Sequence, residues 1–331
     1  MVQAVCSLFQ NVSNKDSSSL PLVIGNPADT LHTSSGPVTL YIPEFSKPTG
    51  RYINKILLRA LNRLMRSGSL AIAGNPCTPG LGIIDAFTTE TAGDILEKSP
   101  RRTVMVNCRK IIGNPPGIAF KAEPFMQLSI RPCWKSINDC LSDMHSKYRV
   151  RAKKALTESA VLQSQIFRGR EIPSDYFPVM AHLLSQTLSQ KTIALPPNLT
   201  HLLKSFANQF GQDFEVQVYH HNNHPVGFLS RIYLPSGVYG MHIGYNSQNA
   251  KQWHIYQRMM IDLIDQAIAA GATKVNLGRT ATEIKSTLGA VPEENYFVLL
   301  SRNPFIRFAA KTYKKLFFKP GSYIIRKPFK D

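Results

Sequence analysis

The sequence predicts an α/β protein (α+β) with a mixed central sheet flanked by helices, and three observations lead to this class. Residues 214–246 alternate as a three-strand meander, and residues 251–270 follow as one amphipathic helix. A short apolar strand at 274–277 then leads into a polar loop and a second short helix. Strand and helix periods thus alternate in the order β-β-β-α-β-α.

The composition is that of a globular chain with a strong basic excess. Its 331 residues predict one or two domains. The formal net charge of +18 predicts an anionic partner such as nucleic acid, a phosphorylated cofactor or an acidic membrane surface, although a solvated basic surface has the same charge. Five cysteines without a Cys-x-x-Cys pair give no zinc pattern, so no metal is expected. Apolar runs are too short for a membrane span, and a cytoplasmic location is expected.

The first expected sub-domain covers residues 1–135 and is α/β but indistinct. Residues 11–36 are rich in Ser, Asn, Asp and Pro and predict a loop. Apolar periodicity predicts a helix at 53–66. Short apolar runs predict strands at 38–45, 69–73, 81–87, 103–107 and 118–122.

The second expected domain covers residues 136–301. A helical period runs through 137–159, with a basic second half, and two further helices are expected at 176–188 and 198–210. The meander comprises strands at 214–220, 226–234 and 237–244, with a hairpin loop at 221–225. The helix at 251–270 ends at Gly271, and a late strand is expected at 296–301.

Polar residues gather directly after the strand at 274–277. The chain continues through Gly278-Arg279-Thr280 into a short helix that carries Glu283 and Lys285. Open α/β sheets usually bind their ligands at the carboxyl ends of strands, so we expect a site here.

These segments resemble the GNAT acyltransferases, in particular the Fem-like branch of peptidoglycan-type aminoacyltransferases and related bacterial acyltransferases. The resemblance covers roughly residues 130–301. It is carried by Ser146-Lys147-Tyr148-Arg149, His242-Ile243-Gly244-Tyr245-Asn246, Trp253-His254-Ile255-Tyr256 and the run from Leu277 to Ala290. It implies a GNAT fold built as two GNAT-like halves, with the N-terminal half degenerate, and the activity of an N-acyltransferase.

One segment departs from the family pattern. GNAT enzymes bind the coenzyme A pyrophosphate on a glycine-containing turn at the start of the long helix. Here that place holds Asn246-Ser247-Gln248-Asn249-Ala250-Lys251-Gln252-Trp253, whose side chains obstruct close backbone approach. The resemblance therefore leaves acyl-CoA, acyl carrier protein and aminoacyl-tRNA as candidate donors, with no tightly bound cofactor.

The resemblance places the donor between two diverging strands, at 237–244 and 274–277. Each candidate also has an ordinary structural explanation, such as a half-exposed strand histidine, a packed tyrosine, an ion pair with Glu283 or a solvated helix face. The catalytic candidates are His242, Tyr245, Arg279 and Lys285. The donor-binding candidates are Met241, Ile243, Gly244, Asn276, Gly278, Thr280, Lys147 and Arg149. His242 is considered as a general base, Tyr245 as a proton donor, and the basic residues as phosphate or carboxylate binders.

Residues 302–331 form a basic, aromatic tail with nine Lys or Arg and seven aromatic residues. Residues 304–318 predict an amphipathic helix with an apolar face opposite a basic one, which suits an anionic membrane surface, docking on the domain, or tRNA binding. Three functions follow: acyl transfer from acyl-CoA or acyl carrier protein to an amine at the inner membrane face, aminoacyl-tRNA-dependent transfer of the Fem type, and a non-catalytic lipid- or RNA-binding module.

Overall fold

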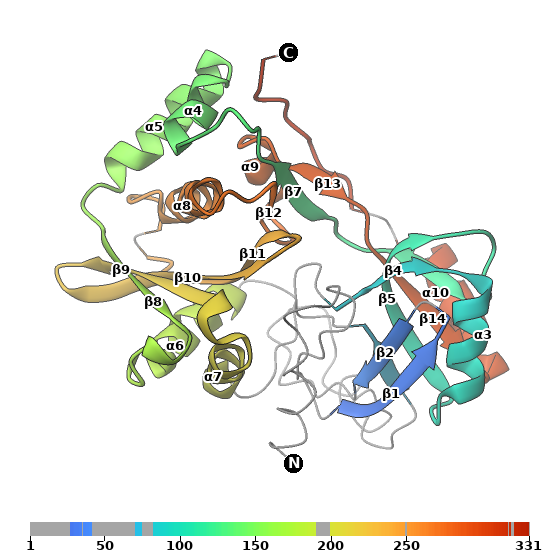
Figure 1. Cartoon of the computed structure of the whole chain (residues 1–331). Helices are drawn as coiled ribbons and strands as arrows, with labels where there is room; N and C mark the ends of the chain where they lie inside the picture. The colour runs from blue at the N-terminus through green and yellow to red at the C-terminus, as the bar shows by residue number, and fades with distance from the viewer. Residues whose placement is uncertain are drawn as a thin grey trace. The chain divides into compact units, whose positions relative to one another are not determined.

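A computed structural model describes residues 27–34, 36–41, 70–74, 82–189, 199–248, 250–316, 318 and 321–330. The chain divides into two compact units (Figure 1). Unit 1 comprises Met1–Pro124, Ala194–Pro197 and Glu293–Ser322. Unit 2 comprises Phe125–Ile193, Asn198–Pro292 and Tyr323–Asp331. The helix expected at 53–66 lies outside the described residues.

Unit 1 is built on a seven-stranded mixed sheet. Its main path runs β1-β2-β3-β5-β14-β6, and β4 pairs with β5 off this path. The strands are β1 (Pro27–Thr33), β2 (Gly36–Tyr41), β3 (Leu70–Ala73), β4 (Ile84–Phe87), β5 (Thr103–Ile111), β6 (Ile118–Lys121) and β14 (Tyr296–Ser301). Helices α3 (Thr89–Lys98) and α10 (Pro304–Leu316) contact this sheet (Figure 1).

Two sequence expectations for this unit are corrected by strand pairing. β1 is a strand within the polar segment 11–36, which was expected to be loop, and it pairs antiparallel with β2. β14 was assigned to the domain 136–301, yet it pairs with β5 and β6. The ladder of β14 with β5 is continuous from Tyr296 to Ser301, and a long-range pairing of this kind leaves no signal in the local pattern.

Unit 2 contains a second seven-stranded mixed sheet in the order β13-β7-β12-β11-β10-β9-β8. The strands are β7 (Phe125–Ser129), β8 (Gln163–Arg168), β9 (Phe214–His221), β10 (His224–Leu234), β11 (Gly237–Tyr245), β12 (Lys274–Asn276) and β13 (Val291–Glu293). β11 and β12 are parallel, whereas β8, β9, β10 and β11 pair antiparallel in succession. The predicted meander, long helix and following strand are confirmed.

Helices cover both faces of the sheet of unit 2 (Figure 1). One layer contains α4 (Ile137–Ser142), α5 (Ser146–Glu158) and α8 (Ile255–Ala269), and the other contains α6 (Tyr176–Ser189) and α7 (Leu199–Phe210). Short 3-10 turns lie at Gly169–Glu171 and Gly211–Asp213, and α9 (Thr282–Ser286) follows β12. Mixed sheets flanked by helices confirm the predicted fold class.

The single helix expected at 137–159 is two helices. A capping box at Ser136 and Asp139 starts α4, which ends at Ser142, and α5 begins at Ser146. Met144 forms a bridge with Phe329, and Pro328 O accepts the His145 N–H at 2.7 Å. The tail at 323–331 therefore belongs to unit 2, and its pairing replaces the hydrogen bonds that a continuous helix would have made.

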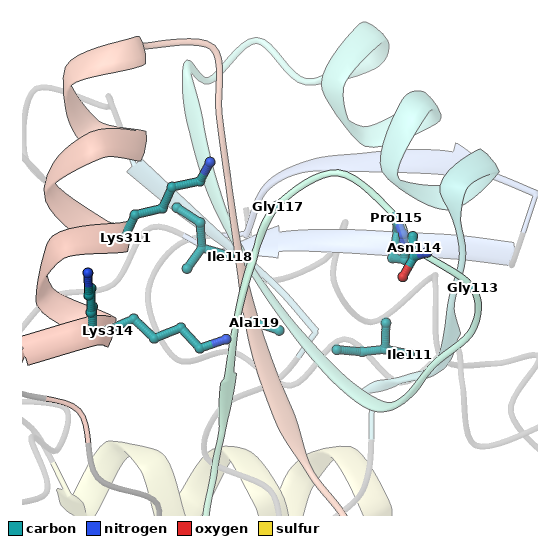
Figure 2. A pocket seen from close by; sticks show the side chains of 10 residues that line it. Ile111, Gly113, Asn114, Pro115, Gly117, Ile118, Ala119, Lys311 and Lys314 are labelled. Atoms are coloured by element: carbon teal, nitrogen blue, oxygen red, sulfur yellow. The ribbon is translucent and has the colours of Figure 1, made fainter.

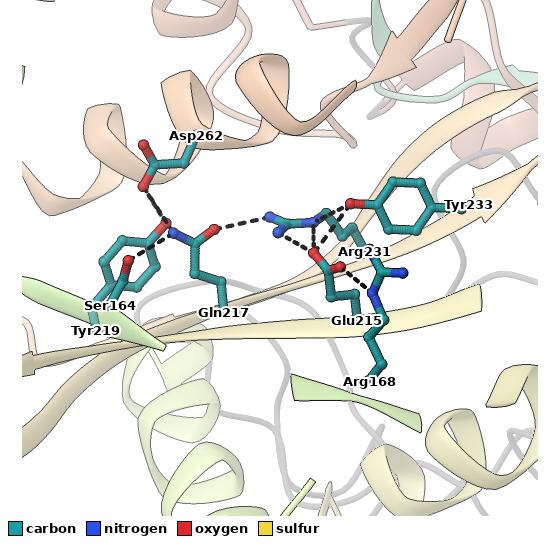
Figure 3. Close-up of polar contacts among 8 residues, drawn as sticks. All are labelled: Ser164, Arg168, Glu215, Gln217, Tyr219, Arg231, Tyr233 and Asp262. Atoms are coloured by element: carbon teal, nitrogen blue, oxygen red, sulfur yellow. Dashed lines mark hydrogen bonds and ion pairs between the residues drawn. The ribbon is translucent and has the colours of Figure 1, made fainter. Parts of the chain in front are cut away.

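A buried polar network lies between β9, β10 and α8 (Figure 3). Arg231 is fully buried, and it donates from Nε to Glu215 Oε1 at 2.6 Å and from Nη1 to Gln217 Oε1 at 3.0 Å. Gln217 and Tyr219 both donate to Asp262 Oδ2, at 3.2 and 2.8 Å. Burial raises the pKa of Asp262 and holds the pKa of Tyr219 well above its usual value. The members satisfy one another, which is the requirement for a stable buried network.

Candidate functional site

The candidate site lies where β11 and β12 separate. Their parallel ladder contains only two residue pairs, Val238 with Val275 and Tyr239 with Asn276. Beyond Asn276 the chain follows β7 instead, since the Leu277 N–H donates to Met126 O at 2.8 Å and Gly278 O accepts from the Met126 N–H at 3.0 Å. The remainder of β11, residues 241–245, continues without β12 as a neighbour.

A β-bulge explains why β11 turns away. The register with β10 shifts between Leu229 and Arg231, so that Met241 and His242 together lie opposite Ser230. A bulge adds twist and bends the strand that carries the extra residue. Gly240 precedes the bulge and has no room for a side chain, because an added Cβ would lie 2.5 Å from Leu263 Cδ2 of α8.

Backbone groups of β11 face the side from which β12 has departed. The Tyr245 N–H points away from β10 and donates to Thr187 Oγ1 of α6 at 3.0 Å. Alternate residues of an antiparallel strand direct their backbone groups to the same side. The N–H and C=O of Ile243 therefore also point away from β10, and an extended ligand can pair with such an open strand edge.

The chain after β12 adopts uncommon backbone angles. Thr280 and Ala281 have φ values of 64° and 49°, in the left-handed region that disfavours side chains, and Gly278 has a φ of 79°. Such conformations persist only where surrounding contacts fix them, and they are frequent at ligand-binding sites. Asn276 is buried and accepts the Gly278 N–H through Oδ1 at 2.8 Å, while its Nδ2 makes no hydrogen bond to the described residues.

The side chain of Lys285 is hydrogen-bonded to the backbone of this loop. Its side chain is only 2% exposed, and Nζ donates to the carbonyl oxygen of Arg279 at 2.6 Å. The residue was expected to bind phosphate or carboxylate, and the structure instead directs its ammonium to the loop backbone. The guanidinium of Arg279 lies 5.5 Å from the centre of the Phe125 ring, and Glu283 pairs with Arg326 rather than with either basic residue.

His242 is part of the packed layer under the bulge. Its Nδ1 lies 3.1 Å from Ser230 Oγ, which also accepts the His242 N–H at 3.0 Å. The ring packs edge-to-face against Phe206 of α7, and burial lowers the pKa of His242 to about 4. These contacts favour a structural role, in which Ser230 satisfies the backbone N–H that the bulge leaves without a ladder partner.

Tyr245 and Tyr256 lie at the open end of β11. Their ring centroids are 6.3 Å apart, and burial raises the pKa of both phenols above the usual value for tyrosine. Tyr245 is therefore a protonated hydroxyl at neutral pH. Thr187, which fixes the backbone of Tyr245, was not anticipated because nothing in an apolar helix marks one threonine as a strand partner.

The two residues before α8 contact other side chains of the protein. The helix begins at Ile255, four residues later than expected, after His254 with a φ of 46°. His254 Nε2 contacts Glu158 Oε2 of α5 at 2.6 Å, and Trp253 packs on His221 with ring centroids 4.6 Å apart. The helix therefore starts without the glycine-containing turn on which GNAT enzymes bind a pyrophosphate, and His254 makes no side-chain hydrogen bond to its first turn.

Two expected donor-binding residues lie on α5, which packs against α8 and α4. Arg149 donates from Nη1 to the carbonyl oxygens of Met144 and Ser142 at 3.1 and 3.4 Å, and thus binds the end of α4. Lys147 is exposed. The structure places residues 241–245 on β11 and residues 276–280 at the end of β12 and in the loop after it, beyond the last paired residues of the two strands. It places Lys147 and Arg149 on α5, away from both segments.

Comparison with known proteins identifies the domain. Residues 144–286 match the family described as the acetyltransferase (GNAT) domain. The chain carries a GNAT domain. The predicted GNAT relationship is thereby confirmed, and with it the assignment to the acyltransferases. No curated protein matches the chain.

Solved structures share the fold at low sequence identity. The C-terminal domain of an Agrobacterium fabrum protein described as a lysylphosphatidylglycerol synthetase has a TM-score of 0.53 at 10% identity, covering 95% of this chain and 97% of that one. L-PGS from Bacillus licheniformis has a TM-score of 0.50 at 10% identity, covering 88% and 89%. FemX, at 10% identity, covers 88% and 89% with a TM-score of 0.44. None of the helices in the described part of the GNAT protein has the length and apolar character needed to cross a bilayer.

Proposed function

We propose that this GNAT protein is an N-acyltransferase that moves an acyl group from a carrier-bound donor to an amine. The observation that supports the proposal is the separation of β11 from β12 after Tyr239 and Asn276, which leaves the backbone of Ile243 without β12 as a partner. In the reaction the amine nitrogen forms a bond to the acyl carbonyl carbon. The bond to the carrier breaks, and the carrier leaves with the proton that the amine loses.

Backbone donors and positioning supply the chemistry in this proposal. The Ile243 N–H would bind the carbonyl oxygen as it gains charge, and one such donor contributes about 2.7–4 kcal/mol to transition-state stabilisation. Alignment of the two reactants contributes about 7–11 kcal/mol. The hydroxyl of Tyr245 would donate a hydrogen bond to the leaving group, since burial raises the pKa of this phenol and keeps it protonated at neutral pH.

Arg279 would bind an anionic group of the donor or acceptor. Its carbonyl is fixed by Lys285, so the loop position of the guanidinium is determined by a buried contact. We expect Arg279→Ala to reduce turnover strongly while the melting temperature changes little. Arg170→Ala removes the same charge from an exposed position in the same unit and is the matched control. Equal turnover in both variants would remove Arg279 from the site.

The donor is the open part of the proposal. The absence of a glycine-containing turn before α8, where Trp253 and His254 stand instead, disfavours the usual pyrophosphate contacts of coenzyme A. This leaves acyl carrier protein or a short-lived acyl-CoA contact as the first candidates. The second candidate is an aminoacyl-tRNA. The fold similarity to a lysylphosphatidylglycerol synthetase is the reason to include aminoacyl donors and lipid acceptors among the substrates tested.

Thermal shift measurements separate these donors. A ligand that binds only the folded protein raises stability in proportion to RT ln(1 + [L]/Kd). Acetyl-CoA, long-chain acyl-CoA and acyl carrier protein are compared with their acyl-free carriers. A shift with an acylated carrier supports the first donor class. No shift, together with RNase-sensitive tRNA that copurifies with the protein, supports the second class, and no shift and no tRNA leaves the non-catalytic binding module.

An anionic membrane surface is the proposed location of the acceptor. Three apolar side chains of α10 are largely exposed, with Phe305 82%, Phe308 73% and Leu316 62% exposed, whereas Tyr313 packs on Phe120 of β6 with ring centroids 6.4 Å apart. The alternative that this face docks on the domain is therefore disfavoured. Flotation with anionic vesicles tests the proposal: Phe305→Ser with Phe308→Ser should reduce flotation severalfold, and unchanged flotation excludes insertion of this face.

A further inference from the structure

A pocket in unit 1 has no role in the proposed acyl transfer. It measures about 580 Å³ and lies between α10 and the segment that joins β5 to β6 (Figure 2). One wall is the loop with Gly113, Asn114 and Pro115. The other wall carries three lysines of α10, Lys311, Lys314 and Lys315.

The three lysines give this pocket a concentrated positive charge. None of them makes an ion pair with a described residue, and no acidic residue is among the lining residues. The helix dipole accounts for Lys314 and Lys315, which lie in the last turn, but Lys311 lies a turn earlier. In Figure 2 the side chain of Lys311 extends from the helix toward the strand that carries Ile118. All three lysines are exposed, and all three line the same pocket, where their charges add.

The remaining lining is small or apolar. Gly113 and Gly117 have φ values of 71° and 133°, and an added Cβ at Gly113 would meet no atom within 4 Å. The loop backbone is thus approachable from the pocket. Ile111 and Ile118 supply an apolar surface, and Asn114 supplies an amide opposite the lysines. The pocket therefore combines point charges for an anion with a surface for a flat or aliphatic group.

A phosphate ester fits this combination best. Lysine binds phosphate as a point charge. A phosphate carries close to two negative charges at neutral pH, whereas a carboxylate carries one. Several ammonium groups therefore suit a phosphate better than a carboxylate. The volume lies in the range of about 300–1,000 Å³ that is typical of small-molecule sites. A free phosphate ion alone would leave most of the pocket empty.

We propose that this pocket binds a phosphate ester, with its phosphate against Lys311, Lys314 and Lys315 and its organic part against Ile111 and Ile118. The ester comes from a soluble molecule of nucleotide size or from the headgroup of a phospholipid, since both present the same chemistry. The proposal is independent of the acyl-transfer site, because every residue in it belongs to unit 1.

Titration calorimetry with AMP and ADP tests the soluble source, and flotation with phosphatidylserine vesicles tests the lipid source. Lys311→Gln with Lys314→Gln should weaken binding about tenfold or more, as loss of two charge-assisted contacts requires, and high salt should weaken it similarly. Lys153→Gln with Lys154→Gln removes two charges from α5 and should change binding less than about twofold. Melting curves of both variants report their folding.

The backbone amide signals of Gly113 and Gly117 give a second measurement on the unaltered protein. Both should shift on addition of whichever probe binds, saturating with the calorimetric Kd. Binding of AMP or ADP with these shifts assigns a soluble ester, and binding of vesicles alone with the same lysine dependence assigns a headgroup. Three results would overturn the proposal. They are failure of all three probes to bind, binding of RNA alone, and an equal loss of binding in the α10 and α5 lysine variants.

Discussion

The pH dependence of stability tests the structural role of His242. Burial lowers the pKa of this imidazole to about 4, whereas an exposed histidine titrates near 6.5. The unfolded chain therefore binds a proton at His242 before the folded protein does. The stabilising effect of burying a neutral ring is complete above pH 6.5 and is lost as the pH falls from 6.5 toward 4.

The size of the effect follows from the two pKa values. One pKa unit corresponds to about 1.4 kcal/mol, so the complete loss approaches about 3 kcal/mol and the loss at pH 5 is about 2 kcal/mol. We expect the free energy of unfolding from urea titrations to fall by this amount between pH 7 and pH 5 because of His242. In His242→Gln that contribution disappears, and the remaining pH dependence belongs to the other groups.

His224→Gln is the matched control, because His224 is exposed at the start of β10 and its replacement should leave the pH dependence intact. The turnover of His242→Gln should stay within severalfold of the unaltered enzyme, since a base with a pKa near 4 removes protons poorly at neutral pH. The structural assignment would be refuted if the free energy of unfolding of His242→Gln depended on pH as it does in the unaltered protein. A loss of turnover without a loss of stability would also refute it, and would restore His242 as the general base.

Three further substitutions test the packing around the site. Arg231→Met removes one of the two arginine partners of buried Glu215, and Arg168 keeps its contact with the other carboxylate oxygen at 2.7 Å. The free energy of unfolding should fall by about 1.5–3 kcal/mol, and Arg231→Met with Glu215→Leu should recover part of it. Urea titration of both variants decides, and no recovery contradicts the ion-pair argument. Gly244→Ala places a Cβ 2.5 Å from the backbone of α6 and should lower the free energy of unfolding by about 2 kcal/mol. Gly93→Ala, in the middle of α3 where a Cβ meets no atom within 4 Å, should raise it by about 0.5–1 kcal/mol. Equal melting temperatures of the two variants would show that α6 shifts without cost. Lys285→Met should raise hydrogen exchange of the amides at 278–281 by about tenfold or more, because a charge-assisted hydrogen bond to the loop is lost, and unchanged exchange would contradict that role.

The sequence predicts the central part of unit 2 well because the signals there are local. Alternating apolar residues mark β9, β10 and β11, and the period of α8 places its apolar face on the sheet. The separation of β11 from β12 follows from the family resemblance rather than from any pattern in the residues. Its physical cause, the bulge opposite Ser230, depends on pairing with β10 and is invisible in the strand itself.

Tertiary contacts account for what the sequence does not predict. The period at 137–159 is continuous, yet the tail residue Phe329 pairs with Met144 and breaks the helix. Lysine in a short polar helix is normally solvated, so nothing local marks Lys285 as buried. The apolar face of α10 was recognised from its period, but only the structure distinguishes exposure of Phe305 and Phe308 from docking.

The place of β14 in the sheet has a consequence for how the protein is made. β14 lies between β5 and β6, although more than half of the chain separates it from them in sequence. A nascent chain leaving the ribosome therefore exposes the unpaired edges of β5 and β6 throughout synthesis of residues 125–292. N-terminal segments usually fold first during translation, but here the earlier unit must wait for a late strand. During that interval its open edges can pair with other extended chains, so aggregation competes with folding until β14 is made.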